Sequence, residues 1–222
     1  MIGGLCVLCV FRRQNFATLS LDVVKLPRAF YDRPTLEVAR DLLGKVLVHR
    51  RGRSHTGGMI VEVEAYIGES DPACHAAPGP TGRNEPLYGL PGHSYVYLNY
   101  GIHSLMNVVT EAQGSPAAIL IRALEPLEGI AAMRRRRAQR MKGSRALLAH
   151  ELCRGPGNLT TAMGITLGDN RRDLGGDRLF IEDRALQVGP IHWGPRIGIR
   201  VGVDRPWRAY VAGHASVSGP RT

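Results

Sequence analysis

Two blocks of sequence decide the fold: GMIVEVEAYIGESDPACHAA at residues 58–77 and GHSYVYLNYGIHSLMNVVT at residues 92–110. In the first block, apolar and polar residues alternate from Met59 to Tyr66, which is typical of a strand. The period of two predicts one face made of Met59, Val61, Val63 and Ala65 and another made of Ile60, Glu62, Glu64 and Tyr66. Glu64 and Tyr66 are therefore predicted to project from the strand in the same direction.

The second block predicts a β-hairpin. Residues 95–98 are aromatic and β-branched, Asn99-Tyr100-Gly101 has the composition of a turn, and residues 105–110 return as a strand. Turn tips usually carry small polar residues because they face water. Tyr100 therefore allows two interpretations: its ring contacts a molecule outside the protein, or it folds back onto the sheet.

The chain is basic, and arginine supplies most of its positive charge. Lys and Arg number 29 against 19 Asp and Glu, which gives a formal net charge of +10, and lysine occurs only at Lys25, Lys45 and Lys142. This charge indicates a polyanionic partner, although an acidic membrane surface or simple solubility would also suit it. The planar fork of arginine matches phosphate, which favours nucleic acid.

Further helices and strands are predicted around the two blocks. A length of 222 residues favours one domain or at most two. The patterns predict helices at residues 32–44 and 125–140, a long functional or disordered loop at residues 69–92, and strands at residues 45–50, 118–124, 179–181, 197–203 and 207–211. We expect an α+β fold: a single domain with a curved, mostly antiparallel β-sheet surrounded by helices.

Both ends of the chain are expected to lie outside this domain. We expect residues 1–20 to form a disordered extension, residues 21–215 the domain and residues 216–222 a flexible tail. The opening apolar run precedes its positive charges, the reverse of a secretory signal, and no stretch is typical of a membrane span. Four scattered cysteines suit the cytoplasm, and the Cys6–Cys9 pair lacks the second pair that a zinc site needs.

Two further features are candidate binding sites for phosphate groups. Residues 134–137 are consecutive arginines on the predicted helix, and Arg140 follows them. A solvated helix face is the ordinary interpretation of such a run, and a contact with the DNA backbone is the alternative. The sequence GPGN at residues 155–158 is predicted to open a short helix, whose exposed N–H groups can hold a phosphate.

Four blocks follow one another along the chain: VEVEAYIGESDPACHA at residues 61–76, GHSYVYLNYGIHSLMNVVT at residues 92–110, ILIRALEPLEG at residues 119–129 and ELCRGPGNLTTAMGI at residues 151–165. Short motifs such as EAY and GPG are weak evidence alone. In this order and spacing, however, the blocks resemble the 3-methyladenine (alkyladenine) DNA glycosylase family, and the resemblance covers residues 28–211. It implies a monofunctional DNA glycosylase of base excision repair, which flips alkylated purines out of the duplex and hydrolyses their bond to the sugar without a cofactor.

The resemblance implies that Glu64 and Arg122 are the catalytic residues. Breaking an N-glycosidic bond leaves positive charge at C1′ of the sugar, and a carboxylate can activate water and stabilise that cation. Glu64 matches the glutamate that activates water, and Arg122 matches an arginine that holds it, together with a backbone carbonyl near Ile197. Without the resemblance, a solvated or salt-bridged carboxylate would be the ordinary interpretation of Glu64. Because two close, dry carboxylates would raise one pKa, we expect Glu62 to lie nearer solvent or to pair with an arginine.

The resemblance also implies a pocket for the flipped base. Tyr66 and His75 are expected on one side of the base, Tyr97 on the other and Asn107 near its edge. Tyr100 is expected to enter the minor groove, as apolar wedges do, so that the protruding hairpin inserts into the DNA. A pocket of this kind supplies flat faces and a few polar groups.

Arg83, Arg154, Gly155 and Gly157 are candidate contacts to the DNA backbone. The expected partner is double-stranded DNA containing alkylated purines, bound by a monomer that associates with the nucleoid through DNA. This chain departs from the family pattern at Ala76, Ala77 and Asn158, and the departures leave open the phosphate contacts and the range of lesions accepted. Strand cleavage by a Schiff base is not expected, because no lysine matches a pocket position.

Three other functions suit parts of the sequence. A module of the same fold could bind damaged or structured nucleic acid without cutting it. A metal-dependent hydrolase could use Glu62, Glu64, His75 and His103, although their spacing is poor for metal ligands. An RNA-binding protein could use the arginines and tyrosines to hold a single strand.

Overall fold

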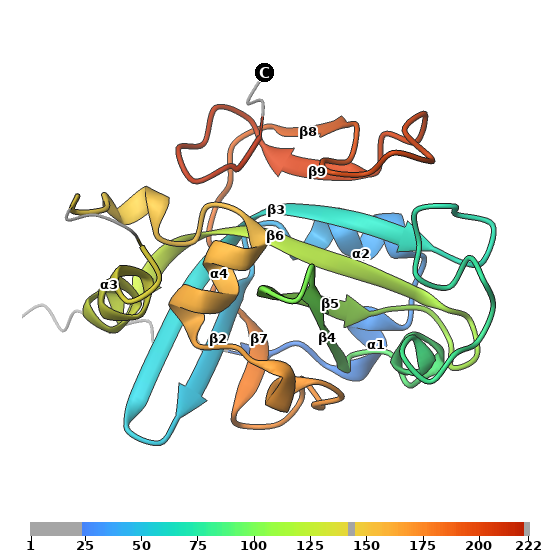
Figure 1. Ribbon diagram of the computed structural model, residues 1–222, viewed down its shortest axis with the longest axis horizontal. Coiled ribbons are helices and arrows are strands. Elements are labelled where there is room, and N and C mark those ends of the chain that lie inside the picture. Colours follow the sequence, from blue (N-terminus) through green and yellow to red (C-terminus); the bar gives the residue numbers. More distant parts are fainter. Residues whose placement is uncertain (1–23, 142–144, 220–222) are drawn as a thin grey trace, which may run out of the picture.

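One antiparallel sheet organises the molecule, and the computed structural model describes residues 24–141 and 145–219. The strands are β1 (Val24–Lys25), β2 (Val46–Arg51), β3 (Ser54–Ile67), β4 (Ser94–Asn99), β5 (His103–Val109), β6 (Ala117–Glu128), β7 (Leu179–Asp183), β8 (Ile191–Gly194) and β9 (Arg208–Val211). Within the described residues, the sheet has nine strands in the order β1-β7-β2-β3-β6-β5-β4, and β9 pairs with both β3 and β8. Figure 1 shows β3 and β6 crossing the molecule side by side, with β8 and β9 drawn above them. The predicted α+β, single-domain fold with a mostly antiparallel sheet is confirmed.

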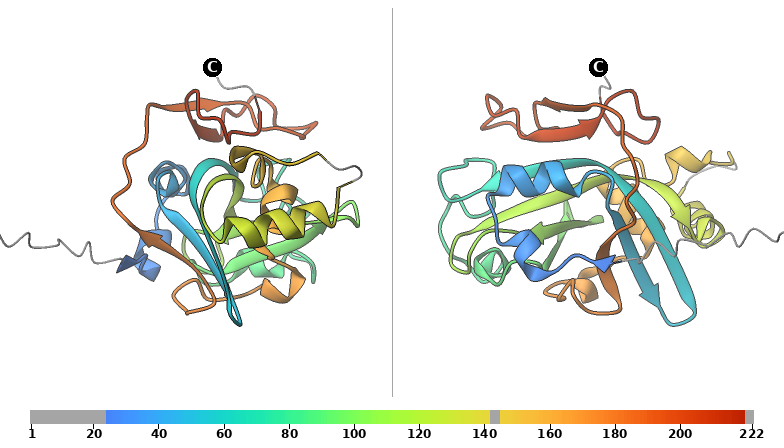
Figure 2. Two further views of the ribbon diagram at one scale, coloured as in Figure 1. Left: turned by 90° about the vertical axis from the view of Figure 1, so that its left-hand side faces the viewer. Right: turned by 180° about the vertical axis from the view of Figure 1, so that it is seen from behind.

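The helices are short and pack against this sheet. They are α1 (Arg28–Tyr31), α2 (Thr35–Leu42), α3 (Ile130–Ala138) and α4 (Pro156–Met163), with 3₁₀ helices η1 (Glu85–Tyr88), η2 (Ala149–Glu151) and η3 (Leu167–Asp169). Seen from behind, α2 lies along β3 (Figure 2). Among the described residues, no helix combines the length and the apolar character that crossing a bilayer requires.

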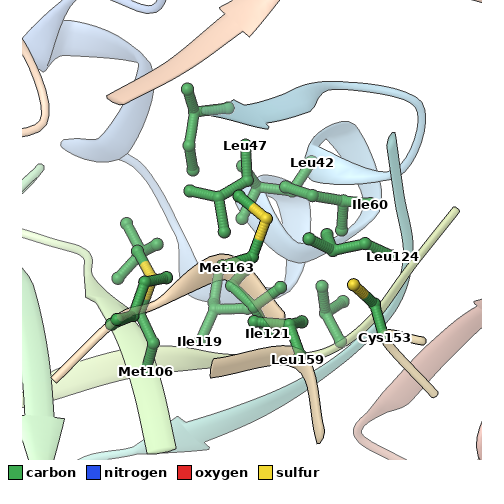
Figure 3. Close-up of a cluster of buried hydrophobic side chains, with 14 of the residues drawn as sticks. Leu42, Leu47, Ile60, Met106, Ile119, Ile121, Leu124, Cys153, Leu159 and Met163 are labelled. Carbon is green, nitrogen blue, oxygen red and sulfur yellow. The ribbon is translucent and has the colours of Figure 1, made fainter. Parts of the chain in front are cut away.

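The main hydrophobic core joins the helices to the sheet. Leu42 of α2, Ile60 of β3, Ile121 of β6, and Leu159 and Met163 of α4 are fully buried and lie together (Figure 3). Burying one such side chain contributes roughly 1.5–3 kcal/mol relative to leaving it exposed. The core therefore fixes α2 and α4 against the strands that carry the candidate site residues.

A bulge in β3 changes the predicted faces of that strand. Its pairing with β6 shifts register between Ile60 and Glu62 and again between Glu62 and Val63. As a result Ile60 packs with Val63 in the main core, whereas Met59 and Val61 pack in a smaller cluster beside β9. The prediction that Ile60 shares a face with Glu62 is wrong, because the extra residue interrupts the period of two.

Strand β6 continues farther than predicted, and the helix after it begins later. Residues 125–128 were predicted as the start of a helix, but they pair with β3, where Gly57 and Gly58 lie opposite Glu128 and Pro126. The turn follows at Gly129, which has φ 69° and no room for a side chain, since a Cβ there would lie 2.2 Å from the His55 carbonyl oxygen. The helix therefore starts only at Ile130.

The arginine run braces α3 against its neighbours. Arg137 is buried and donates to the carbonyl oxygens of Leu152 at 2.6 Å and Glu151 at 3.2 Å. Arg136 donates to the carbonyl oxygen of Ala162 at 2.9 Å and to the Ser54 hydroxyl at 2.8 Å. A solvated face is therefore the wrong interpretation for Arg136 and Arg137, which use their charge to satisfy backbone carbonyls between helices.

The remaining predictions concern one helix, several strands and the two chain ends. The helix of residues 32–44, the 94–110 hairpin and the strands near residues 46, 179 and 208 are confirmed, whereas residues 197–203 form a loop and not a strand. The tail predicted from residue 216 begins with two fully buried residues, Ser216 and Val217. The predicted extension of residues 1–20, with Cys6 and Cys9, lies outside the described residues.

Candidate active site

Three donors hold the carboxylate of Glu64. Its Oε2 accepts from the Tyr66 hydroxyl at 2.9 Å and from Arg122 Nη1 at 3.1 Å, and its Oε1 accepts from the backbone N–H of Ile197 at 2.6 Å. Glu64 and Tyr66 thus project the same way, as predicted, and Glu64 is fully buried. Ile197 thus contacts Glu64 through its backbone N–H, whereas the resemblance implies a role for a backbone carbonyl near this residue. Charge-assisted bonds of this kind are stronger than those between neutral groups, so the carboxylate is fixed in place.

Glu62 is also buried, and it is paired with arginine. Its Oε1 accepts from Arg208 Nε at 2.7 Å and from Arg122 Nε at 3.2 Å, while its Oε2 accepts from the Ser218 N–H at 2.7 Å. Arg122 therefore lies between the two glutamates and bonds both. Of the two expectations for Glu62, pairing with an arginine is confirmed and proximity to solvent is wrong.

Burial and charge push the pKa values of the two glutamates apart. Burial raises the pKa of Glu64 above its usual range, and Arg122 opposes the rise only in part. Burial acts in the same direction on Glu62, but the charge of Arg122 and the hydrogen bonds from Ser218 and Arg208 outweigh it and lower the pKa of Glu62. Two carboxyls whose pKa values are pushed apart can take different roles. Here Glu62 stays ionised, and Glu64 is the group able to take up a proton.

A cavity of about 450 Å³ opens beside Glu64. The side chains of Tyr66 and Arg122 line it together with Ile197, and these are the three residues that bond the Glu64 carboxylate. Glu64 therefore lies behind the cavity wall. The volume falls in the range of small-molecule pockets, which are roughly 300–1,000 Å³.

The other predicted pocket residues line the same cavity. His75 comes from the 69–92 loop, Tyr97 from β4 and Asn107 from β5. The rings of His75 and Tyr97 touch edge to face, with centroids 4.5 Å apart, so a base that enters between them must first separate them. Burial, aided by the charge of Arg83, lowers the pKa of His75 and keeps its ring neutral at neutral pH.

Tyr95, which was not predicted as a site residue, orients the pocket side chains. Its hydroxyl lies 2.9 Å from Nδ1 of His75, and its carbonyl oxygen accepts from the amide nitrogen of Asn107 at 3.0 Å. Tyr95 alternates with Tyr97 on β4, so the same period of two that marks Tyr97 also marks Tyr95 as a pocket residue.

Tyr100 stands at the tip of the β4–β5 hairpin and points outward. It is 88% exposed, which excludes the interpretation that it folds back onto the sheet. Its φ is 49°, in the left-handed region that residues other than glycine seldom adopt. Tyr100 also lines the mouth of the cavity. An exposed aromatic in a strained turn is common at functional sites.

The candidate backbone contacts lie near this mouth. Helix α4 begins at Pro156, which lines the cavity, and Gly157 packs so tightly on His103 that a Cβ there would lie 2.9 Å from its ring. Arg154 donates through Nε to the Val217 carbonyl oxygen at 3.0 Å. Arg83 is exposed, with its guanidinium 5.9 Å from the ring centre of Tyr97.

The residues proposed for a metal-dependent hydrolase are engaged elsewhere. Glu62 and Glu64 bond arginines, His75 bonds Tyr95, and His103 packs on Gly157. In residues 24–141 and 145–219, no group of three or more His, Cys, Asp or Glu side chains is placed to hold a metal ion.

A basic chain and an aromatic cavity with a buried carboxylate behind it suit an enzyme that acts on a base of nucleic acid. The family model described as methylpurine-DNA glycosylase matches residues 29–215, and the chain belongs to this family. It is therefore a DNA glycosylase, a repair enzyme that hydrolyses N-glycosyl bonds and has DNA as its substrate. The predicted family and enzyme class are confirmed, which sets aside the non-catalytic module.

Several proteins are similar to this chain over most of its length. A protein of Methanocella arvoryzae is 51% identical over 189 residues, which cover 83% of this chain and 91% of the relative. Proteins of Burkholderia lata and Chlorobium phaeobacteroides are 46% identical over 200 residues, which cover 89% of this chain and 92% and 96% of the relatives. All three are provisionally named 3-methyladenine DNA glycosylase.

Proposed function

We propose that the chain excises alkylated purines of the 3-methyladenine class from duplex DNA, with water activated by Glu64 as the nucleophile. The observation that carries the proposal is the placement of Glu64: a buried carboxylate with a raised pKa, bonded by Tyr66, Arg122 and Ile197, directly behind an aromatic cavity. The names of the relatives favour this class of base.

In the proposed reaction a water oxygen attacks C1′ of the sugar. The N-glycosidic bond breaks, the base leaves with the electron pair of that bond, and the water proton passes to Glu64. Burial supports this step because it raises the pKa of Glu64 toward that of an effective general base. Arg122 supports it because its charge favours the ionised carboxylate before the reaction.

The base is proposed to enter the cavity after flipping out of the helix. Tyr66, His75 and Tyr97 offer flat faces for stacking, and Asn107 offers an amide near the edge of the base. A neutral His75 suits this role, because alkylated purines such as 3-methyladenine carry positive charge and a protonated ring would repel them. Extruding a damaged base costs a few kcal/mol, less than for an intact pair.

Tyr100 is proposed to occupy the space that the flipped base leaves. Its exposure and its position at the cavity mouth support insertion from the hairpin tip. Arg83, Arg154 and the α4 N-terminus at Gly155 and Gly157 are proposed to hold the flanking phosphates, since helix N-termini and arginines both favour anions.

The enzyme is proposed to leave the strand uncut. Strand-cleaving glycosylases attack C1′ with an amine. Lys25 and Lys45 pair with Asp177 and Asp183 and do not line the cavity, while Lys142 lies outside the described residues. This placement supports water as the nucleophile.

Replacing Glu64 by glutamine tests the general base. The amide has nearly the same shape but cannot take up a proton, so E64Q is expected to lower single-turnover base release by about 10²–10⁴-fold. Binding to duplex DNA carrying an abasic analogue should stay within about threefold of wild type, because glutamine keeps the shape of the glutamate side chain. A threefold change in affinity corresponds to less than about 1 kcal/mol. Base release is followed by mass analysis, with E37Q on the exposed face of α2 as the matched control. Wild-type release by E64Q would remove Glu64 from the mechanism.

The pH dependence of base release tests the state of Glu64. Glu64 must be ionised to accept a proton, and its pKa is raised, so the rate should fall as the pH drops through a value above the ordinary glutamate pKa. Single-turnover rates across the acid range, measured on a lesion that is stable there, locate this limb. A limb at or below the ordinary value would contradict the burial argument.

Replacing Tyr100 by alanine tests insertion of the hairpin. Loss of the ring should weaken binding to a duplex with a flipped abasic analogue roughly tenfold, because stacking on an aromatic ring contributes roughly 1–3 kcal/mol. Binding is measured by fluorescence anisotropy, and Y100F, which keeps the ring, should bind as wild type does. Equal affinity of Y100A and wild type would refute the wedge.

A further inference from the structure

We infer that Arg196 is a positioning residue for the excision reaction: it braces the pocket wall at Tyr66 and places the Ile197 amide on Glu64. Arg196 lies in the loop between β8 and β9, which carries no strand or helix of its own. The inference rests on the proposed role of Glu64, and it concerns how that carboxylate and the wall in front of it are held in register.

A buried ion pair fixes the guanidinium of Arg196. Its Nη1 lies 2.5 Å from Asp71 Oδ2 and its Nη2 lies 2.8 Å from Asp71 Oδ1, and both side chains have 0% exposure. Burying two charges is costly unless the geometry is excellent, and the bidentate fork of arginine meets this condition. Nη2 also donates to the Gly202 carbonyl oxygen at 3.2 Å.

The same guanidinium braces Tyr66. Its central carbon lies 4.7 Å from the ring centre of Tyr66 and 5.2 Å from that of Trp207. Its Nη1 also donates at 3.0 Å to the carbonyl oxygen of Ala65, the residue between Glu64 and Tyr66 on β3. A desolvated arginine over an aromatic face is attracted by the ring. The ring that lines the cavity is thus held by a rigid planar group.

Two of the three donors to Glu64 depend on Arg196. The Tyr66 hydroxyl bonds Oε2 and the adjacent Ile197 N–H bonds Oε1, at 2.9 and 2.6 Å. Ile197 follows Arg196 in the chain, so the ion pair that anchors Arg196 also fixes the position of this amide. The third donor, Arg122, is held separately by Glu62.

Asp71 extends the same support to the loop that carries His75. Its carboxylate accepts from the N–H of Ala73 at 3.2 Å and from that of Ile67 at 3.4 Å. Ala73 and His75 line the cavity. This one buried ion pair therefore connects three segments: the end of β3, the 69–92 loop and the β8–β9 loop.

Loss of the Ile197 bond should change the titration of Glu64. That bond lowers the pKa of Glu64 and opposes the effect of burial, so weakening it should move the pKa of Glu64 higher. The ionisable groups around Glu64 are Glu62 and Tyr66 of β3, Tyr97 of β4, Arg122 of β6, Arg208 opposite it on β9, and Arg196 itself. An Arg196 variant keeps every one of these groups except Arg196 itself.

The test compares R196Q and R196K with R205Q as the matched control. Arg205 also faces Asp71, at 3.7 Å, and packs on Trp207, but its guanidinium is not among the groups that bond or face Tyr66 and Glu64. We expect R196Q to lower single-turnover base release about 10²-fold, as a small misplacement of a reacting group can. We expect its acid limb to move to higher pH, R196K to lie between R196Q and wild type, and R205Q to stay within about twofold with its limb unchanged.

Each outcome decides the inference. Folding of every variant is checked by circular dichroism, and if R196Q does not fold, R196K carries the test because it keeps the charge without the fork or the planar face. A wild-type rate, or a reduced rate with an unmoved acid limb, in a folded Arg196 variant would overturn the inference. E64Q, assayed alongside, separates the two claims: if E64Q still releases base, the proposed mechanism fails whatever Arg196 does.

Discussion

The candidate active site depends on one arginine that holds two buried glutamates together. Glu62 and Glu64 are both fully buried two residues apart on β3, where their like charges would repel without a cation between them. Arg122 bonds both, and Arg208 bonds Glu62 from the neighbouring strand. Two carboxylates thus meet two guanidinium groups, which offset the repulsion between the two like charges.

A bulge in the sheet brings the glutamates and arginines of this cluster together. The bulge in β3 turns Glu62 and Glu64 away from the main core and toward Arg122 on β6 and Arg208 on β9. Bulges are common beside active sites because they redirect side chains. The C-terminal segment completes the arrangement, since the Ser218 N–H bonds the second oxygen of Glu62. The segment predicted to be a tail therefore supports the candidate active site.

Local patterns predicted much of the fold, and the family resemblance predicted most of the cavity residues. Alternation on β3 placed Glu64 beside Tyr66, and turn chemistry at Asn99 and Gly101 placed Tyr100 on a hairpin tip. Patterns within one segment could not show the partners of Glu62 and Glu64, because Arg208 and Ile197 lie more than a hundred residues away in sequence. They also missed the continuation of β6, which depends on the glycines opposite it.

The central claim is that this buried site releases an alkylated base, and the most direct test is mass analysis of the bases freed from methylated duplex DNA by the purified protein. The account predicts free 3-methyladenine in solution above the spontaneous rate, without added metal or cofactor. Release no faster than from the same DNA incubated without the protein would contradict it.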